Sequence, residues 1–188
     1  MNDQREKFGI GDDELVALPT VFAPDLFKGR VVLVSGAGSG LGKAIAVLFA
    51  RLGATLAICG RDSAKLDRAA VLLRGLGAAV SCHAMTIRDP DGVAAMMDAV
   101  DERHGRLDIL INNAGGQFPQ AAIDFSVKGW NAVIDTNLNG TWHMMQSAAR
   151  RWRDNATPGC IVNIVADIWR GMPGIAHTCA ARAGVIYL

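Results

Sequence analysis

Glycines placed between a short apolar run and an amphipathic stretch constrain this sequence more than any other feature. The apolar run VVLVS (31–35) leads into SGAGSGLG (35–42), and residues 41–53 continue with apolar side chains at helical spacing. Glycine permits a tight turn and lets the backbone approach a phosphate group, which the first amides and the dipole of the helix then attract. The pattern predicts a buried strand, a phosphate-binding turn and a helix, although a tight turn without a ligand is the alternative. The predicted binding residues of this turn are Gly36, Ser39, Gly40, Leu41 and Gly42.

Strand-like and helix-like segments then alternate along the chain. Further apolar runs at 55–60, 78–84, 107–112 and 160–165 predict strands, and residues 63–75, 90–104, 127–153 and the segment from about His177 predict helices, the first of them opened by Ser63. Strands separated by helices favour a parallel sheet covered on both faces. The predicted fold class is therefore α/β: a doubly wound parallel sheet, or Rossmann fold, in three α/β/α layers. Residues 1–28 form a polar arm and residues 29–188 form the dinucleotide-binding domain.

Composition excludes several classes of protein. The chain has 188 residues, 51% hydrophobic and 20% charged, which suits one globular domain. The net charge is +1 without a basic block, so nucleic acid and anionic membranes are not expected partners. No apolar run approaches the ~18 residues of a membrane span, and the polar, acidic N-terminus does not resemble a secretory signal. A cytoplasmic protein with a small-molecule substrate is expected.

The cysteines and histidines do not form a recognisable metal-binding pattern. Cys59, Cys82, Cys160 and Cys179 include no C-x-x-C pair, and the four histidines are scattered. The first three cysteines lie in predicted strands, where a thiol behaves as a small apolar group. Reduced core thiols and no metal site are expected.

The end of the second predicted strand bears on the choice of nucleotide. Many NAD-binding proteins place an acidic residue there for the ribose hydroxyls, whereas this sequence has Gly60 followed by Arg61. A guanidinium can hold a 2′-phosphate through paired hydrogen bonds, so NADP(H) is favoured. Asp62, one position later, keeps NAD(H) possible, and a solvated arginine is the alternative interpretation of Arg61.

Three motifs in order resemble the short-chain dehydrogenase/reductase family. SGAGSGLG is followed by INNAGG (111–116) and NLNG (137–140) at the distances typical of that family, and the similarity runs from about Lys28 to the end. The resemblance implies cofactor contacts by Asn113, Ala114 and Gly115 and a catalytic-site asparagine at Asn137. It also places Thr86 and Ile87 at the adenine, although many members have an acid at the position of Thr86. A helix-bending polar residue is the alternative for Asn137.

The remaining catalytic positions depart from the common family pattern. Ordinary members have a serine after the fifth strand and then Y-x-x-x-K, with a tyrosine that protonates a carbonyl oxygen. Here the serine position falls on Val165 or Ala166, the tyrosine position on Thr178 and the lysine position on Arg182. Tyr187, the only tyrosine, is about 140° further round a helix than Arg182 and is not expected to replace the donor.

NNAGGQF, KGWNAVIDTNLNGTW and HTCAARAGV look most similar to the trans-2-enoyl-CoA reductase branch of the family, neighbour to the 2,4-dienoyl-CoA reductases. Such enzymes reduce a carbon–carbon double bond conjugated to a thioester, and the resulting enolate needs hydrogen-bond donors. The resemblance implies an enolate donor at Thr178, ribose binding and positive charge at Arg182, and a water ligand at Asn137. A helix N-terminal hydroxyl is the alternative for Thr178. Two other functions stay open: an oxidoreductase of alcohols, aldehydes or ketones, and a non-catalytic cofactor-binding oligomer.

The stretch 127–153 also predicts self-association. Trp142, Met144, Met145 and Trp152 present more apolar surface than one sheet face should cover, so a homo-oligomer, by resemblance a tetramer, is expected. Trp130, Trp142 and Trp152 are expected to pack or to lie at an interface rather than to hold a substrate. The family continues beyond GVIYL with further elements that cover the substrate, so a C-terminal part is expected to be missing.

Overall fold

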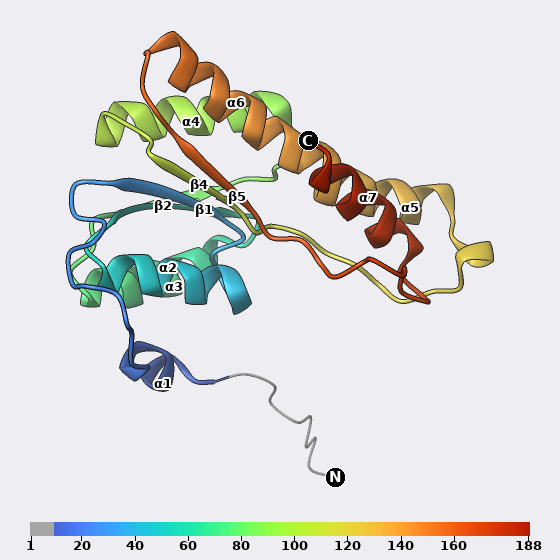
Figure 1. Ribbon diagram of the computed structural model, residues 1–188, viewed down its shortest axis with the longest axis horizontal. Helices are drawn as coiled ribbons and strands as arrows, with labels where there is room; N and C mark the ends of the chain where they lie inside the picture. The colour runs from blue at the N-terminus through green and yellow to red at the C-terminus, as the bar shows by residue number, and fades with distance from the viewer. Residues whose placement is uncertain (1–9) are drawn as a thin grey trace.

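The chain forms a parallel β-sheet with helices on both faces (Figure 1). A computed structural model describes residues 10–188. The strands are β1 (Val31–Ser35), β2 (Thr55–Gly60), β3 (Val80–Ala84), β4 (Ile109–Asn112) and β5 (Cys160–Asn163). They lie in the order β3-β2-β1-β4-β5, and every neighbouring pair is parallel. The predicted doubly wound α/β fold is confirmed.

Alternate residues of β1 explain how the two helical layers are held. The helices are α1 (Asp12–Ala17), α2 (Gly40–Arg51), α3 (Ser63–Gly75), α4 (Pro90–His104), α5 (Val127–Ile134), α6 (Gly140–Asp154) and α7 (Ala176–Ile186). Val32 and Val34 pack in the core formed with α2 and α3, whereas Val31 and Leu33 pack in the core formed with α4 and α6. Figure 1 shows these helix pairs on opposite faces of the sheet. A strand buried on both sides is expected to be apolar, as the first four residues of β1 are.

The stretch predicted as one helix over 127–153 is interrupted. A π-helical turn, η2 (Asp135–Asn139), lies between α5 and α6 and carries Asn137 into the interior, where only 1% of it is exposed. The apolar surface inferred for this stretch is also smaller than predicted. Met144 is fully buried in the core, and Trp152 packs against that core and donates its indole N–H to the Leu107 carbonyl at 2.6 Å. Trp142 is 41% exposed.

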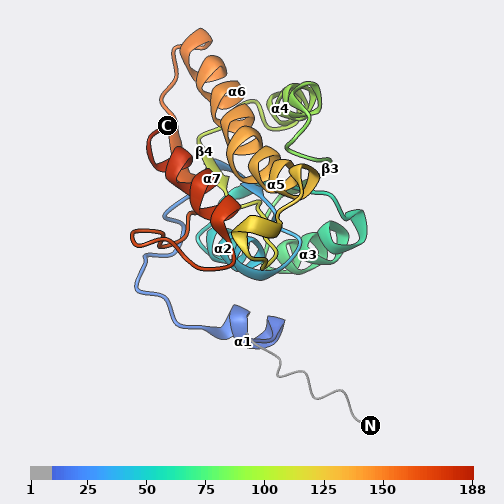
Figure 2. The same ribbon diagram turned by 90° about the vertical axis from the view of Figure 1, so that its right-hand side faces the viewer.

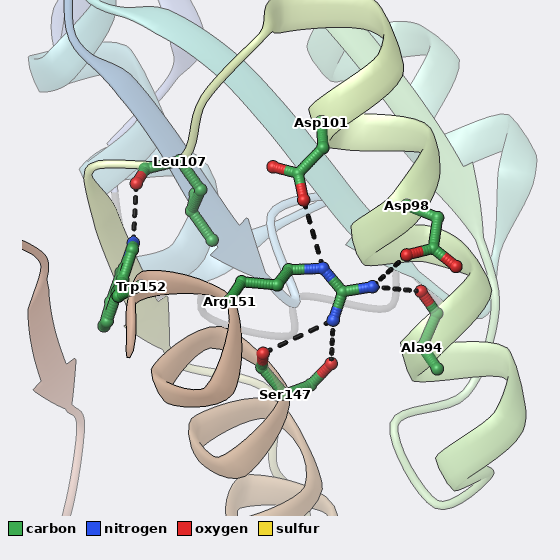
Figure 3. A network of polar contacts seen from close by, with 7 residues as sticks. All are labelled: Ala94, Asp98, Asp101, Leu107, Ser147, Arg151 and Trp152. Atoms are coloured by element: carbon green, nitrogen blue, oxygen red, sulfur yellow. Dashed lines mark hydrogen bonds and ion pairs between the residues drawn. The ribbon is translucent and has the colours of Figure 1, made fainter. Parts of the chain in front are cut away.

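A polar network fixes the far end of α6 to α4 (Figure 3). Arg151 Nε donates to Asp101 Oδ2 at 3.1 Å, and Nη2 donates to the Ala94 carbonyl at 3.1 Å and forms an ion pair with Asp98. Nη1 donates to Ser147 Oγ at 2.8 Å. With every guanidinium nitrogen engaged, the C-terminal end of α6, far from η2, is held against α4.

Several smaller expectations need correction. The arm contains the short helix α1, which lies near α2 and is joined to it by an ion pair between Asp12 and Lys43; residues 1–9 of the arm lie outside the described residues. α3 begins at Ser63 as predicted, and Asp62 caps it by accepting the Lys65 amide at 3.0 Å. The three strand cysteines are not alike: Cys59 is buried, Cys82 is half-buried, and Cys160 is exposed because β5 is an edge strand. Within residues 10–188 no helix combines the length and apolarity that a bilayer span requires.

Candidate active site

A cavity of about 220 Å³ opens at the carboxyl ends of β1, β2 and β4. The strand order reverses between β1 and β4, which is where ligands bind in open α/β sheets. The predicted residues that line the cavity are Gly36, Ser39, Arg61, Thr86, Ile87, Ala114 and Gly115. The sheet therefore brings together, from four separate segments, most of the residues predicted from sequence for a nucleotide.

Three predicted residues of the glycine turn, Gly40, Leu41 and Gly42, are not among the residues that line the cavity. Gly36 and Gly40 have φ angles of +69° and +55°, which favour glycine. A Cβ atom on Gly42 would lie 2.4 Å from both Asn113 Nδ2 and the Gly36 carbonyl oxygen. Leu41 is 69% exposed. The turn thus needs glycine for its backbone conformation and for its close contact with the segment after β4.

Ser35 and Asn113 join the ends of β1 and β4. Ser35 Oγ accepts the amides of Asn113 and Ala114 at 3.1 and 3.0 Å, and Asn113 Nδ2 donates to the Ser35 carbonyl at 3.0 Å. The neighbouring Asn112 binds no backbone group through its side chain, which donates instead to Asn163 Oδ1 at 2.9 Å. Sequence reasoning missed Ser35; a hydroxyl residue closing an otherwise apolar strand was the available signal.

One corner of the cavity is basic. Arg61 and Lys65 both line it, and Arg88 borders it from the segment after β3. Asp62 also lines the cavity, but one of its oxygens caps α3 and the other lies 3.8 Å from Lys65 Nζ. Lys65 was missed by sequence reasoning, although it follows Arg61 by one helical turn. The corner suits an anionic group more than a neutral hydroxyl pair.

Asn137 is held by a reciprocal pair of hydrogen bonds. The Gly116 amide donates to Asn137 Oδ1 at 2.9 Å, and Asn137 Nδ2 donates to the Gly116 carbonyl at 2.9 Å. These bonds fix the side chain while leaving one N–H and one lone pair for a further partner. The buried position in η2 gives the side chain a definite orientation beside the loop after β4, as a site residue requires.

Thr178 and Arg182 lie on one buried face of α7, with 3% and 8% of each residue exposed. A Cβ atom on Gly115 would lie 2.3 Å from Arg182 Nη2 and 3.1 Å from Asn137 Oδ1, so these groups meet above the loop after β4. Arg182 makes no ion pair or side-chain hydrogen bond with another of the residues 10–188, and burial lowers its pKa from the ordinary value. Figure 2 shows α7 beside α5 and α6. The guanidinium is thus an unpaired cation at the cavity's edge.

The start of α7 holds two further unpaired groups. Thr178 Oγ1 and His177 Nε2 are buried without a hydrogen-bond partner among the described residues. His177 Nδ1 accepts the Thr178 amide at 2.8 Å, which assigns the ring proton to Nε2. The ring packs between Phe118 and Phe125, with centroid separations of 4.8 and 4.3 Å. Sequence reasoning missed His177, whose only signal was its position before Thr178.

The positions expected to lack a proton donor do lack one. Val165 is 41% exposed, and neither it nor Ala166 carries a hydroxyl at the serine position. Tyr187 follows the end of α7 and is 90% exposed, in contrast to the buried Thr178. The described residues therefore offer hydrogen-bond donors at this end of the cavity but no tyrosine in the usual place.

Comparison with known proteins identifies relatives in sequence and in fold. The family model described as short chain dehydrogenase matches residues 30–188. A probable 2,4-dienoyl-CoA reductase of Bacillus subtilis is 37% identical over 85% of this chain and 63% of its own length, and a peroxisomal 2,4-dienoyl-CoA reductase of Arabidopsis thaliana is 34% identical over 87% and 58%. A solved citronellol catabolism dehydrogenase of Pseudomonas aeruginosa superposes with a TM-score of 0.85 at 36% identity, over 89% of this chain and 69% of its own. The chain thus spans less than two thirds of these dienoyl-CoA reductases, and it belongs to the short-chain dehydrogenase/reductase family.

Proposed function

We propose that this chain belongs to an NADP(H)-dependent reductase of the carbon–carbon double bond of a 2-enoyl thioester. One observation carries the proposal: Thr178 Oγ1 and His177 Nε2 are buried without a hydrogen-bond partner among residues 10–188, and the buried cation Arg182 lies on the same helix. Unpaired buried donors destabilise a fold by about 1–3 kcal/mol each unless a ligand satisfies them. Their concentration at the place of the usual tyrosine and lysine suits an anion that forms during the reaction.

The chemistry explains why donors suffice without a tyrosine. NADPH, when bound, supplies the hydride that reaches Cβ of the conjugated thioester. The electrons of the double bond then move to the thioester oxygen as an enolate, and Cα afterwards takes a proton. The hydroxyl of Thr178 and Nε2–H of His177 donate to that oxygen, and Arg182, which keeps its proton, lends charge and holds ribose hydroxyls. Asn137 retains one free N–H with which to hold the water that delivers the proton.

The preference for NADP(H) rests on the basic corner. Members of this family use NAD(H) or NADP(H), and here Arg61 and Lys65 border the cavity where a 2′-phosphate would lie. Asp62 is the residue that supports NAD(H), and it already caps α3.

The test is steady-state reduction of crotonyl-CoA by Thr178→Val, which keeps the side-chain shape and removes the hydroxyl. Losing one such donor is expected to lower kcat by about 10²–10³ with NADPH affinity unchanged. Arg182→Ala should weaken both NADPH binding and turnover, and Arg182→Lys should retain part of the activity. Thr157→Val is the control, because Thr157 is exposed and lies at the amino-terminal ends of the strands, opposite the cavity. Turnover by Thr178→Val at the wild-type rate would refute the donor role.

A second candidate is an oxidoreductase of alcohols, aldehydes or ketones, favoured by the similarity to the citronellol catabolism dehydrogenase. Parallel assays with a ketone, an aldehyde and crotonyl-CoA separate the two candidates. Turnover of none of them would favour the third candidate, a cofactor-binding oligomer without catalysis.

We also propose a homotetramer in the cytoplasm. Exposed Trp142 on α6 and the half-buried faces of α5 and α7 offer the apolar surface for self-association. A monomer mass by light scattering at micromolar concentration would contradict the tetramer. Fractionation tests the compartment, since the Arabidopsis relative is named as peroxisomal.

A further inference from the structure

Arg88 joins two parts of the cavity that are distant in the sequence. It follows Thr86 and Ile87, the predicted adenine contacts after β3. Its Nε donates to Thr136 Oγ1 at 2.5 Å, and its Nη2 donates to the Ala132 carbonyl at 2.7 Å. Ala132 lies near the end of α5, and Thr136 lies within the π-helical turn, directly before Asn137. The guanidinium therefore binds the chain at the entrance to the turn that carries the catalytic-site asparagine.

The Ala132 carbonyl shows why this contact affects the turn. Thr136 Oγ1 also donates to it at 2.9 Å, so the same oxygen accepts from the side chains of Thr136 and Arg88. Hydrogen bonding in η2 is displaced by one residue, as seen where the Gly140 amide bonds the Asp135 carbonyl five positions earlier. A π turn is rare and needs outside support. Arg88 supplies two hydrogen bonds of that support from another part of the chain.

The segment of Arg88 is itself held on the far side of the turn. Ile87 packs against Gly140, where a Cβ atom would lie 2.6 Å from Ile87 Cγ1. His143 Nδ1 lies 3.3 Å from the Ile87 carbonyl oxygen. The segment after β3 thus contacts the turn on both sides of Asn137. Arg88 bonds Ala132 and Thr136 before it, and Ile87 packs against Gly140 after it.

We propose that Arg88 is a positioning residue: it fastens the π turn to the adenine side of the cavity and so sets the place of Asn137. The bond from the Gly116 amide to Asn137 Oδ1 reports that place directly. The catalytic part of this inference rests on the proposed enoyl thioester reduction. The structural part does not, because the Gly116 amide can be followed without turnover.

The experiment compares Arg88→Ala and Arg88→Lys with Arg68→Ala, an exposed arginine of α3 that makes no side-chain hydrogen bond or ion pair with another described residue. Hydrogen exchange of the Gly116 amide, kcat, and KM for NADPH and crotonyl-CoA are measured. In Arg88→Ala we expect Gly116 to exchange about tenfold faster and kcat at saturation to fall about 10–100-fold, as for a small misplacement of a reacting group. Added ethylguanidinium should restore both quantities in part, and Arg88→Lys should be intermediate.

An unchanged kcat and unchanged Gly116 exchange, with only KM raised, would overturn the inference and make Arg88 a ligand contact. If Arg88→Ala does not fold, Thr136→Val, which removes the hydroxyl that accepts from Arg88, should still speed Gly116 exchange; no change would also overturn it. If the wild type reduces no enoyl thioester, the proposed function fails, but the exchange measurement still decides the positioning role.

Discussion

The two sides of the cavity differ in how their polar groups are satisfied. At the glycine turn, Ser35 and Asn113 bond each other and the backbone of β1 and β4. At α7, His177, Thr178 and Arg182 are buried, and none has a partner for its donor group among the described residues. A buried polar group without a hydrogen-bond partner costs more free energy than a formed hydrogen bond contributes to stability. The polar groups of the turn are therefore satisfied without a ligand, whereas α7 holds buried groups that have no partner among residues 10–188.

The largest expected effect concerns the glycine turn and tests whether it tolerates a side chain at position 42. Gly42→Ala would place a Cβ atom 2.4 Å from the backbone oxygen of Gly36, which cannot move aside as a flexible side chain can. We expect a loss of about 3 kcal/mol in the free energy of unfolding and weakened NADPH binding, measured by urea denaturation and fluorescence titration. Gly75→Ala, which meets nothing within 4 Å, is the matched control. Equal stability of the two variants would remove the steric argument.

The next prediction compares the Ser35 hydroxyl, at the glycine turn, with the Thr178 hydroxyl, on α7. Ser35→Ala leaves the half-buried amides of Asn113 and Ala114 without their acceptor, so the free energy of unfolding should fall by about 2 kcal/mol. Thr178→Val removes a hydroxyl that has no partner, so it should leave stability unchanged or raise it by about 1 kcal/mol. Urea denaturation of both variants measures the difference. A loss of similar size in Thr178→Val would mean that this hydroxyl is already satisfied, and the comparison would fail.

The basic corner predicts a smaller, ligand-dependent effect. Arg61 is exposed and its removal should not affect folding, but Arg61→Ala should weaken NADPH binding about tenfold, or ~1.4 kcal/mol, and leave NADH binding unchanged. Titration of both nucleotides into both proteins measures it. Equal binding of NADPH and NADH by the wild type, unaltered by the substitution, would contradict the preference for NADP(H).

The smallest expected effect lies outside both sides of the cavity. His83 and His104 each place Nε2 within 3.0 Å of Ser81 Oγ. Burial lowers the pKa of both, and the neighbouring charges of His104 and Arg103 lower that of His83 further. The folded state then binds fewer protons than the unfolded state, so stability should fall as the pH drops below about 6.5, the unfolded value. The double variant His83→Gln, His104→Gln should reduce the change of the urea midpoint between pH 7.5 and 5.5. If the midpoint of this variant changes with pH as much as that of the wild type, other groups cause the pH dependence.

The difference between local properties and contacts made by distant residues explains which features could be predicted from the sequence. The strands, the glycine turn and the loop after β4 were predictable because apolar runs and glycine conformations are local properties. The partners of Ser35 and the isolation of His177 depend on residues far away in the chain. The break in the stretch 127–153 was not predicted for a third reason: the π turn between α5 and α6 depends on contacts with other parts of the chain. Met144 and Trp152 pack toward the core, so less apolar surface is free on α6 than predicted.

The contact between Arg182 and Gly115 also couples substitutions at these two positions. Because a Cβ atom on Gly115 would lie 2.3 Å from Arg182 Nη2, a side chain at position 115 fits only if the guanidinium moves away from the loop after β4. That movement would also take the charge of Arg182 away from Asn137 Oδ1, which lies 3.1 Å from the same Cβ position. Substitutions at positions 115 and 182 are therefore expected to be non-additive, and a library that varies Gly115 should vary position 182 with it.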